Sequence, residues 1–203
     1  MRGLFVLNTD AYDLIYGPDE RAAIAESVDI YAPQQTAAQI QANPSLLAGA
    51  DVIFSGWGMA KLDADLLAHA PHLQALFYGA GSIRQFTTEA FWARNIVVTS
   101  AYADNAVPVV EFTVAQILLS LKRTWHFARA VRTARSYPPR TGVAGAYGST
   151  VGLIALGAIG RRVADMLRQF DVRVIAHDPF ADVGTAAQLQ VELCGLDELF
   201  ARS

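Results

Sequence analysis

Short apolar runs rich in β-branched and aromatic residues alternate with amphipathic segments along the chain, and this alternation limits the folds open to it. Strands that alternate with helices form βαβ units, in which helices cover both faces of a parallel sheet. The sequence therefore predicts an α/β protein. The expected strands are Gly3–Asn8, Val28–Ala32, Asp51–Ser55, Leu73–Tyr78, Ile96–Ser100, Thr150–Leu156, Val172–Asp178 and Val191–Cys194. The expected helices include Asp19–Ser27, Thr36–Leu47, Asp63–Ala70, Thr88–Arg94 and Arg161–Phe170.

One long apolar helix, from about residue 106 to residue 135, is predicted to interrupt the alternation. Asp104 and Asn105 are good N-cap residues, and Pro108 would lie in the first turn, where its missing N–H costs little. The Pro- and Gly-rich stretches Ser136–Gly142 and Gly145–Gly148 are predicted to be loop. We therefore expect one domain over residues 1–102 and a linking helix with a second domain over 103–203.

Composition excludes several classes of protein. Of 203 residues, 53% are hydrophobic and 17% are charged, so intrinsic disorder is not expected. The lone Cys194 cannot form an internal disulfide, which favours a reducing, cytoplasmic location. We expect no signal peptide, no apolar stretch near the roughly 20 residues that span a bilayer, and no membrane partner. No metal site is expected either.

Positive charge is concentrated in one part of the chain. No acidic residue lies between Glu111 and Asp165. Such a stretch can bind nucleic acid or steer a phosphorylated ligand, or it can be the solvated face of a helix. Because no aromatic-basic motif accompanies it, we favour the solvated face and expect no nucleic-acid partner. The basic residues are Lys122, Arg123, Arg129, Arg132, Arg135, Arg140, Arg161 and Arg162.

A glycine-rich turn between the sixth expected strand and the following helix is the strongest functional signal. The pattern typical of dinucleotide-binding turns is G-x-G-x-x-G, and here alanine replaces the first glycine. The remaining glycines allow the backbone to approach a pyrophosphate and allow the helix to pack on the strand. The residues predicted to bind the cofactor are Ala155, Leu156, Gly157, Ala158, Ile159 and Gly160.

Asp178 extends this signal, because it ends the next strand about 20 residues past the turn, where NAD enzymes bind the ribose hydroxyls. Its negative charge would repel a 2′-phosphate, which favours NAD over NADP as the cofactor. The alternative is an ordinary βα turn followed by a surface aspartate. Strand, turn, helix, strand and acid occur in the expected order, so we favour dinucleotide binding.

With these residues in place, the chain resembles the D-isomer-specific 2-hydroxyacid dehydrogenases. Gly79, Ala80 and Gly81 are similar to the family's substrate loop, whose backbone amides hold the substrate carboxylate, although Ile83 stands where an aspartate is frequent. Asn105 lies in a stretch similar to the family's hinge. From the residues alone, the Gly79–Gly81 turn could be merely structural and Asn105 could be only an N-cap.

The resemblance implies a flavodoxin-like substrate-binding domain over residues 1–102, followed over 103–203 by the first half of a Rossmann NAD-binding domain. It also implies a homodimer, NAD(H) as hydride carrier and a small 2-hydroxy or 2-oxo acid as substrate. With three Rossmann strands, the strand Thr150–Leu156 is expected to be an open, apolar edge.

The family's catalytic arginine, glutamate and histidine would follow the third Rossmann strand, so we expect the chain to be a C-terminally truncated form that is inactive alone. No catalytic residue is assigned, because the histidines present are interpreted as structural or surface groups: His69, His72, His126 and His177. The favoured function is an NAD-dependent oxidoreductase. The alternatives are a non-catalytic NAD-binding or interaction module, and a flavodoxin-like nucleotide or phosphate binder.

Overall fold

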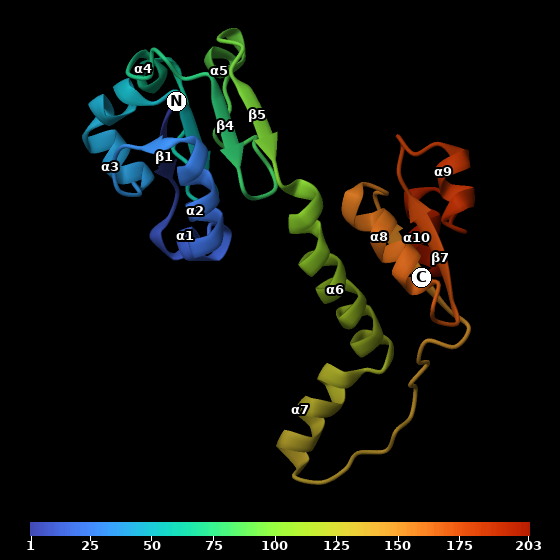
Figure 1. The fold of residues 1–203 in the computed structure, drawn as a ribbon. Coiled ribbons are helices and arrows are strands. Elements are labelled where there is room, and N and C mark those ends of the chain that lie inside the picture. The colour runs from blue at the N-terminus through green and yellow to red at the C-terminus, as the bar shows by residue number, and fades with distance from the viewer. The chain divides into compact units, whose positions relative to one another are not determined.

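A five-stranded parallel sheet organises the first part of the chain in the computed structural model, which describes residues 1–203 (Figure 1). Its strand order is β2-β1-β3-β4-β5, the flavodoxin-like order, which confirms the α/β prediction for this part. The register pairs Gly3 with Val52 and Val52 with Ala75. The strands are β1 (Arg2–Val6), β2 (Asp29–Ile30), β3 (Val52–Ser55), β4 (Ala75–Tyr78) and β5 (Val97–Ser100).

The helices of this sheet begin at side-chain caps where the sequence supplies them. Asp63 accepts a hydrogen bond from Leu66 N, and Thr88 accepts one from Phe91 N. The predicted helix Thr36–Leu47 is wrong in its second half, because Pro44 disfavours helical backbone at the residue before it. The helices are α1 (Thr9–Ile15), α2 (Pro18–Ser27), α3 (Ala37–Ala42), the 3-10 helix η1 (Pro44–Gly49), α4 (Ala64–Ala68) and α5 (Glu89–Ala93).

Both faces of this sheet carry buried side chains, as the alternation of side chains along a strand requires. On one face, Leu4 and Ile53 belong to a cluster with Leu67 of α4 and Phe91 of α5. On the other face, Phe5 and Phe54 pack with Ala11 of α1 and with Tyr16. The sheet is therefore a core in its own right, and its strand ends are held at fixed positions.

A second parallel sheet, with the order β6-β7-β8, organises the rest of the chain. Its strands are β6 (Ser149–Ile154), β7 (Val172–His177) and β8 (Glu192–Leu193). Strand β6 pairs only with β7, so the predicted open edge is confirmed. Its core joins side chains of β6 and β7 to Val163 and Leu167. The helices are α8 (Ala158–Leu167), α9 (Val183–Gln188) and α10 (Leu196–Arg202).

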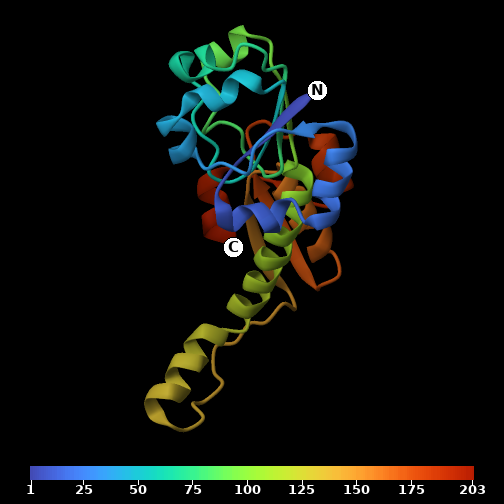
Figure 2. The ribbon, with the colours of Figure 1, turned by 60° about the vertical axis from the view of Figure 1, so that its left-hand side comes forward.

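The chain divides into two units, Met1–Asn105 and Ala106–Ser203, so the division lies three residues after the predicted boundary. The predicted single helix 106–135 is two helices, α6 (Tyr102–Leu121) and α7 (Thr124–Ala134). They are separated where Arg123 adopts a positive φ of 52°. In Figure 2, α7 and the loop after it extend away from the sheet of their own unit.

Helix α6 corrects two further expectations. It begins at Tyr102, so Asp104 and Asn105 lie within its first turns instead of capping it, because Asn105 N already donates to Ala101 O. Pro108 consequently lies inside the helix. The expectation that no stretch approaches membrane-spanning length is also wrong: α6 has 20 residues and is apolar enough to cross a bilayer by length and composition. Its buried Val110 and Val114 belong to the core of the second unit.

Candidate functional site

The glycine turn between β6 and α8 has a geometry that depends on small residues. Ala155 adopts a φ of +75°, in the left-handed region that glycine occupies without cost. A Cβ on Gly160 would lie 2.2 Å from Ala155 O, so only glycine fits where α8 packs on the turn. A Cβ on Gly157 would meet nothing within 4 Å. The turn is therefore tight at Gly160 and open at Gly157.

The open side of the turn is the N-terminus of α8. Gly157 is the N-cap residue, and no side chain caps the helix. The first N–H groups of a helix lack partners inside it, and they attract anions together with the helix dipole. Ala158 and Ile159 in the first turn are exposed. The residues present thus fit a pyrophosphate, and no side-chain atom fills the space in front of Gly157.

Asp178 lies beside the same turn. Its Oδ2 accepts a hydrogen bond from Leu156 N at 2.7 Å, and its Oδ1 accepts one from Phe180 N at 2.8 Å. These backbone donors, Leu156 first, hold the pKa of the Asp178 carboxyl below its usual range. The side chain is therefore an anion at neutral pH. The structure brings together the turn and the acid that the sequence predicted to share one site.

The predicted substrate loop lies in the first unit, at the carboxyl end of β4. Gly79 N donates to Ser55 O at 2.8 Å, so this N–H is not free for a ligand. No hydrogen bond within the structure engages the N–H of Ala80 or of Gly81. Ligands of open α/β sheets bind outside the carboxyl ends of the strands. Of the three residues predicted to hold a carboxylate, two therefore keep a backbone donor.

Asn105 lies next to this loop. Its Nδ2 is 3.1 Å from the position that a Cβ on Gly81 would take, so the amide packs against the backbone of the loop. Because Asn105 is inside α6, the interpretation as an N-cap is wrong. The residue remains a candidate donor at the substrate loop, beside the free N–H groups of Ala80 and Gly81.

Two residues that the sequence analysis did not single out support the substrate loop or the strands before it. Ser100 Oγ, at the end of β5, lies 3.0 Å from Ala80 O and 2.5 Å from Gly81 O. Tyr16 Oη donates to Ser55 O at 2.8 Å and also lies 3.1 Å from Phe77 O, and burial raises the pKa of its phenol to about 12. Ser100 could have been suspected from its position at a strand end, whereas no sequence pattern marks Tyr16.

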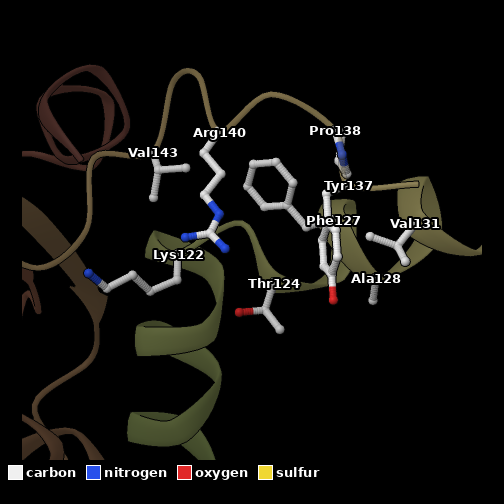
Figure 3. A pocket seen from close by; sticks show the side chains of 9 residues that line it. All are labelled: Lys122, Thr124, Phe127, Ala128, Val131, Tyr137, Pro138, Arg140 and Val143. Carbon is white, nitrogen blue, oxygen red and sulfur yellow. The ribbon is translucent and has the colours of Figure 1, made fainter. Parts of the chain in front are cut away.

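Two residues of the basic stretch, Lys122 and Arg140, line a hollow in the second unit. This hollow of about 600 Å³ lies between the end of α6, the start of α7 and the loop that follows. Figure 3 shows the Arg140 guanidinium pointing into this hollow, with Phe127 and Tyr137 beside it. None of its lining residues belongs to the glycine turn, so this hollow is distinct from the predicted cofactor site.

The histidines show no arrangement suited to proton transfer. None of the four takes part in an ion pair with a carboxylate. His177 Nδ1 lies 3.1 Å from Cys194 O, which is a backbone contact.

Comparison with known proteins gives a consistent result. Residues 114–203 match the family described as D-isomer specific 2-hydroxyacid dehydrogenase, NAD binding domain, which confirms NAD as the cofactor. The chain is 33% identical over 144 residues to D-3-phosphoglycerate dehydrogenase of Mycobacterium bovis, covering 70% of this chain and 27% of that protein. It is 29% identical over 150 residues to glyoxylate reductase of Aeropyrum pernix, covering 70% of this chain and 45% of that one.

Solved structures show the same fold. D-lactate dehydrogenase of Aquifex aeolicus, solved with NAD and lactic acid, aligns with a TM-score of 0.75 at 22% identity. The alignment covers 100% of this chain and 58% of that chain. The present chain therefore spans under two thirds of the length of these proteins. The fold class predicted from the sequence, a flavodoxin-like domain followed by the first part of a Rossmann domain, is confirmed.

Proposed function

We propose that the chain serves NAD-linked oxidation and reduction of a small 2-hydroxy or 2-oxo acid, because residues 114–203 match the NAD-binding domain family of the D-isomer specific 2-hydroxyacid dehydrogenases. The observation that carries the proposal is the glycine turn, with its open helix N-terminus at Gly157 and its carboxylate at Asp178. The named relatives differ in substrate, but each acts on a carboxylate with an oxygen on the neighbouring carbon.

Each element of the two sites has a definite task in this proposal. The first N–H groups of α8 bind the pyrophosphate, and the Asp178 carboxylate accepts the ribose hydroxyls. The N–H groups of Ala80 and Gly81 hold the substrate carboxylate, with the Asn105 amide beside them. Bound NAD(H) supplies or accepts the hydride. The charge of Asp178 disfavours a 2′-phosphate, so NAD is preferred to NADP.

Turnover by the 203-residue chain alone is not part of the proposal. None of its histidines forms an ion pair with a carboxylate, and His177 Nδ1 contacts a backbone carbonyl instead. We propose that it binds NADH and a 2-oxo acid without reducing it. The second candidate function, a non-catalytic NAD-binding module, differs in having no use for the loop at Gly79–Gly81.

We also propose a homodimer that involves α7. No residue of this helix is buried, and Trp125 on it is 49% exposed. A helix of 11 residues is marginal in water without packing, so a second copy would stabilise it. Sedimentation of the wild-type chain should show a dimer, and Trp125→Glu should shift it towards monomer. Trp92→Glu is the control, because that side chain is 47% exposed but lies in the first unit. A cytoplasmic location stays a prediction.

The decisive experiment on the cofactor site uses two glycines in the same setting. Gly157 and Gly195 are both N-cap residues of a helix, and a Cβ on either would meet nothing within 4 Å. Aspartate is a good N-cap residue, so neither variant should lose stability. Its charge at position 157 would repel the pyrophosphate. Titration of NADH by fluorescence should show at least a tenfold weaker affinity for Gly157→Asp, equivalent to about 1.4 kcal/mol, and no change for Gly195→Asp.

Hydrogen exchange tests whether the N–H groups of Ala80 and Gly81 bind the substrate carboxylate. Glyoxylate, pyruvate or oxalate should slow exchange in peptides that contain Ala80 and Gly81 when NADH is present, while the NADH absorbance stays constant. Protection without oxidation supports the proposal as stated. Loss of NADH absorbance would contradict inactivity of the chain alone, and absence of protection would favour the non-catalytic module.

A further inference from the structure

Ala155 holds an unfavourable backbone conformation within the glycine turn. Its φ of +75° is one that alanine rarely adopts, because Cβ crowds the neighbouring carbonyl, whereas glycine would adopt it freely. The conformation matters, since it directs Ala155 O against Gly160 and so sets how α8 starts. An alanine turn left to itself would relax towards negative φ. Something else must hold the turn in place.

The peptide that follows Ala155 is held at both of its polar groups. Leu156 N donates to Asp178 Oδ2 at 2.7 Å. Leu156 O accepts a hydrogen bond from Arg161 Nε at 2.6 Å. Both partners are charged, and hydrogen bonds to charged groups are stronger than those between neutral ones. The Leu156 side chain is also buried, so the turn is fixed by an anion, a cation and an apolar anchor together.

Arg161 is placed where its charge alone would be unfavourable. It is the fourth residue of α8, near the positive end of the helix dipole. The side chain folds back to the turn, where it also faces Asp178 closely enough to lower the pKa of that carboxyl. Arg168, the C-cap residue of the same helix, pairs instead with Asp165 at the surface. Arg161 therefore bonds to the backbone of the turn, whereas Arg168 bonds to a side chain of its own helix.

We propose that Arg161 is a positioning residue that holds the NAD-binding turn in its working conformation and thereby offsets the alanine at the first glycine position. The inference deepens the proposed function, since it concerns the same cofactor site. It makes the contribution of Arg161 dependent on residue 155. With glycine there, the turn needs no support, so loss of the arginine should matter little.

A double-mutant cycle tests this dependence. Arg161→Gln should weaken NADH binding about fivefold, because the side chain is largely exposed and the cost of the alanine conformation is modest. In combination with Ala155→Gly, the same change should cost less than twofold. Arg168→Gln is the matched control on α8 and should leave the affinity unchanged in both backgrounds.

Arg161→Lys separates positioning from a direct attraction between the guanidinium and the phosphates. Lysine keeps the charge but has a methylene where arginine has Nε, so it cannot make the same bond to Leu156 O. The proposal expects lysine to behave like glutamine, with the loss removed by Ala155→Gly. Retained affinity in Arg161→Lys, or a loss that Ala155→Gly does not reduce, would overturn the proposal in favour of direct phosphate binding.

A measurement without cofactor keeps the two proposals distinguishable. In the NAD-free chain, Arg161→Gln should speed hydrogen exchange severalfold in peptides that contain Leu156, and Ala155→Gly should reverse most of that change. If no variant or wild type binds NADH, the cofactor site is refuted, while exchange still tests the contact itself. Unchanged exchange at Leu156 would overturn the positioning role whatever the affinity shows.

Discussion

The two units of this chain each place a turn of small residues at the carboxyl end of a parallel strand, but the side chains that support these turns differ in kind. In the first unit, Gly79 N is bonded to Ser55 O of the neighbouring strand, and the Ser100 hydroxyl supports the loop from β5. In the second unit, the peptide of Leu156 lies between the charged side chains of Asp178 and Arg161. Each turn has one backbone bond to its sheet, since Ala155 N donates to His177 O at 2.9 Å, but only the second turn adds ionised side chains.

This difference shows which backbone groups are left for a ligand. At Gly79–Gly81, the sheet uses the first N–H, so that two donors remain at one point, which suits a carboxylate. At the other turn, the charged contacts fix the residues before Gly157, and the whole first turn of α8 stays open, which suits the larger pyrophosphate. Under the proposed function, similar glycine patterns would thus serve anions of different size, and substitutions should act on them differently.

The largest effect is expected for Gly160→Ala. The new Cβ would lie 2.2 Å from Ala155 O, a backbone atom that cannot move without displacing the turn. We expect the second unit to lose about 3 kcal/mol of stability, the upper end for overpacking, and NADH binding to become undetectable. Urea unfolding measures the stability, and NADH fluorescence measures the binding. Gly157→Ala is the control for stability, because its Cβ enters open space and its φ of −73° suits alanine. Equal destabilisation by both variants would contradict the packing at Gly160.

Asp178→Asn should produce the next largest effect, on cofactor choice. Removing the charge while keeping the shape should raise the affinity for NADPH relative to NADH about tenfold, equivalent to about 1.4 kcal/mol. Competition titrations with both nucleotides measure the ratio. A ratio that stays constant would show that Asp178 does not contact the ribose. Asp182→Asn, on an acid that caps α9, is the control for a general change in charge.

The same variant makes a prediction about pH. The folded pKa of Asp178 lies below its value in the unfolded chain, so the charged form contributes stability above about pH 4, and this contribution is lost as the pH falls through the lower, folded pKa. The stability difference between wild type and Asp178→Asn should therefore be constant from pH 8 to pH 5 and shrink below pH 4. A difference that changes between pH 6 and pH 8 would point to another group.

Periodicity predicted the sheets well because each strand had to bury side chains. All eight expected strands occur, since their apolar runs fill cores such as that around Leu4 and Ile53. The helix ends were harder to predict. Asp104 and Asn105 look like caps, yet α6 starts at Tyr102, because a bond from Asn105 N to Ala101 O competes successfully with capping. The capping preference of Asp104 and Asn105 was thus weaker than the helical hydrogen bonding that begins directly after β5.

The candidate sites divide in the same way. The turn at 155–160 and Asp178 were predictable, because a fixed spacing along one βαβ unit brings them together. The contacts of Tyr16 and Ser100 were not predictable. Tyr16 bonds to the strand before the loop from 61 residues away in the sequence, and Ser100 contacts the loop itself from 19–20 residues away. Contacts of that separation depend on strand order, which the sequence pattern alone does not give.

Gly79→Ala tests whether a clash with side chains costs less stability than the clash with backbone in Gly160→Ala. At position 79 the new Cβ would lie 2.3 Å from Ile15 Cγ2 and 3.3 Å from Tyr16 Oη, which are side-chain atoms. Side chains can shift more easily than backbone, so we expect a loss of about 1 kcal/mol in the first unit. Ile15→Leu removes the β-branched methyl group, and in that background Gly79→Ala should cost less. An undiminished cost would show that the backbone near Ser55 O resists the substitution.

The smallest effect is expected for Ser100→Ala. The hydroxyl carries one proton for two nearby carbonyls, those of Ala80 and Gly81, so it contributes at most one hydrogen bond at a time, worth about 1 kcal/mol or less. Exchange in peptides that contain Ala80 and Gly81 should quicken, while NADH affinity stays unchanged. Ser82→Ala on the same loop is the control, because its hydroxyl makes only a 3.5 Å contact with Arg84 N. If a carboxylate ligand protects the loop equally in Ser100→Ala and wild type, the free N–H groups suffice for binding, and the serine only shapes the unliganded loop.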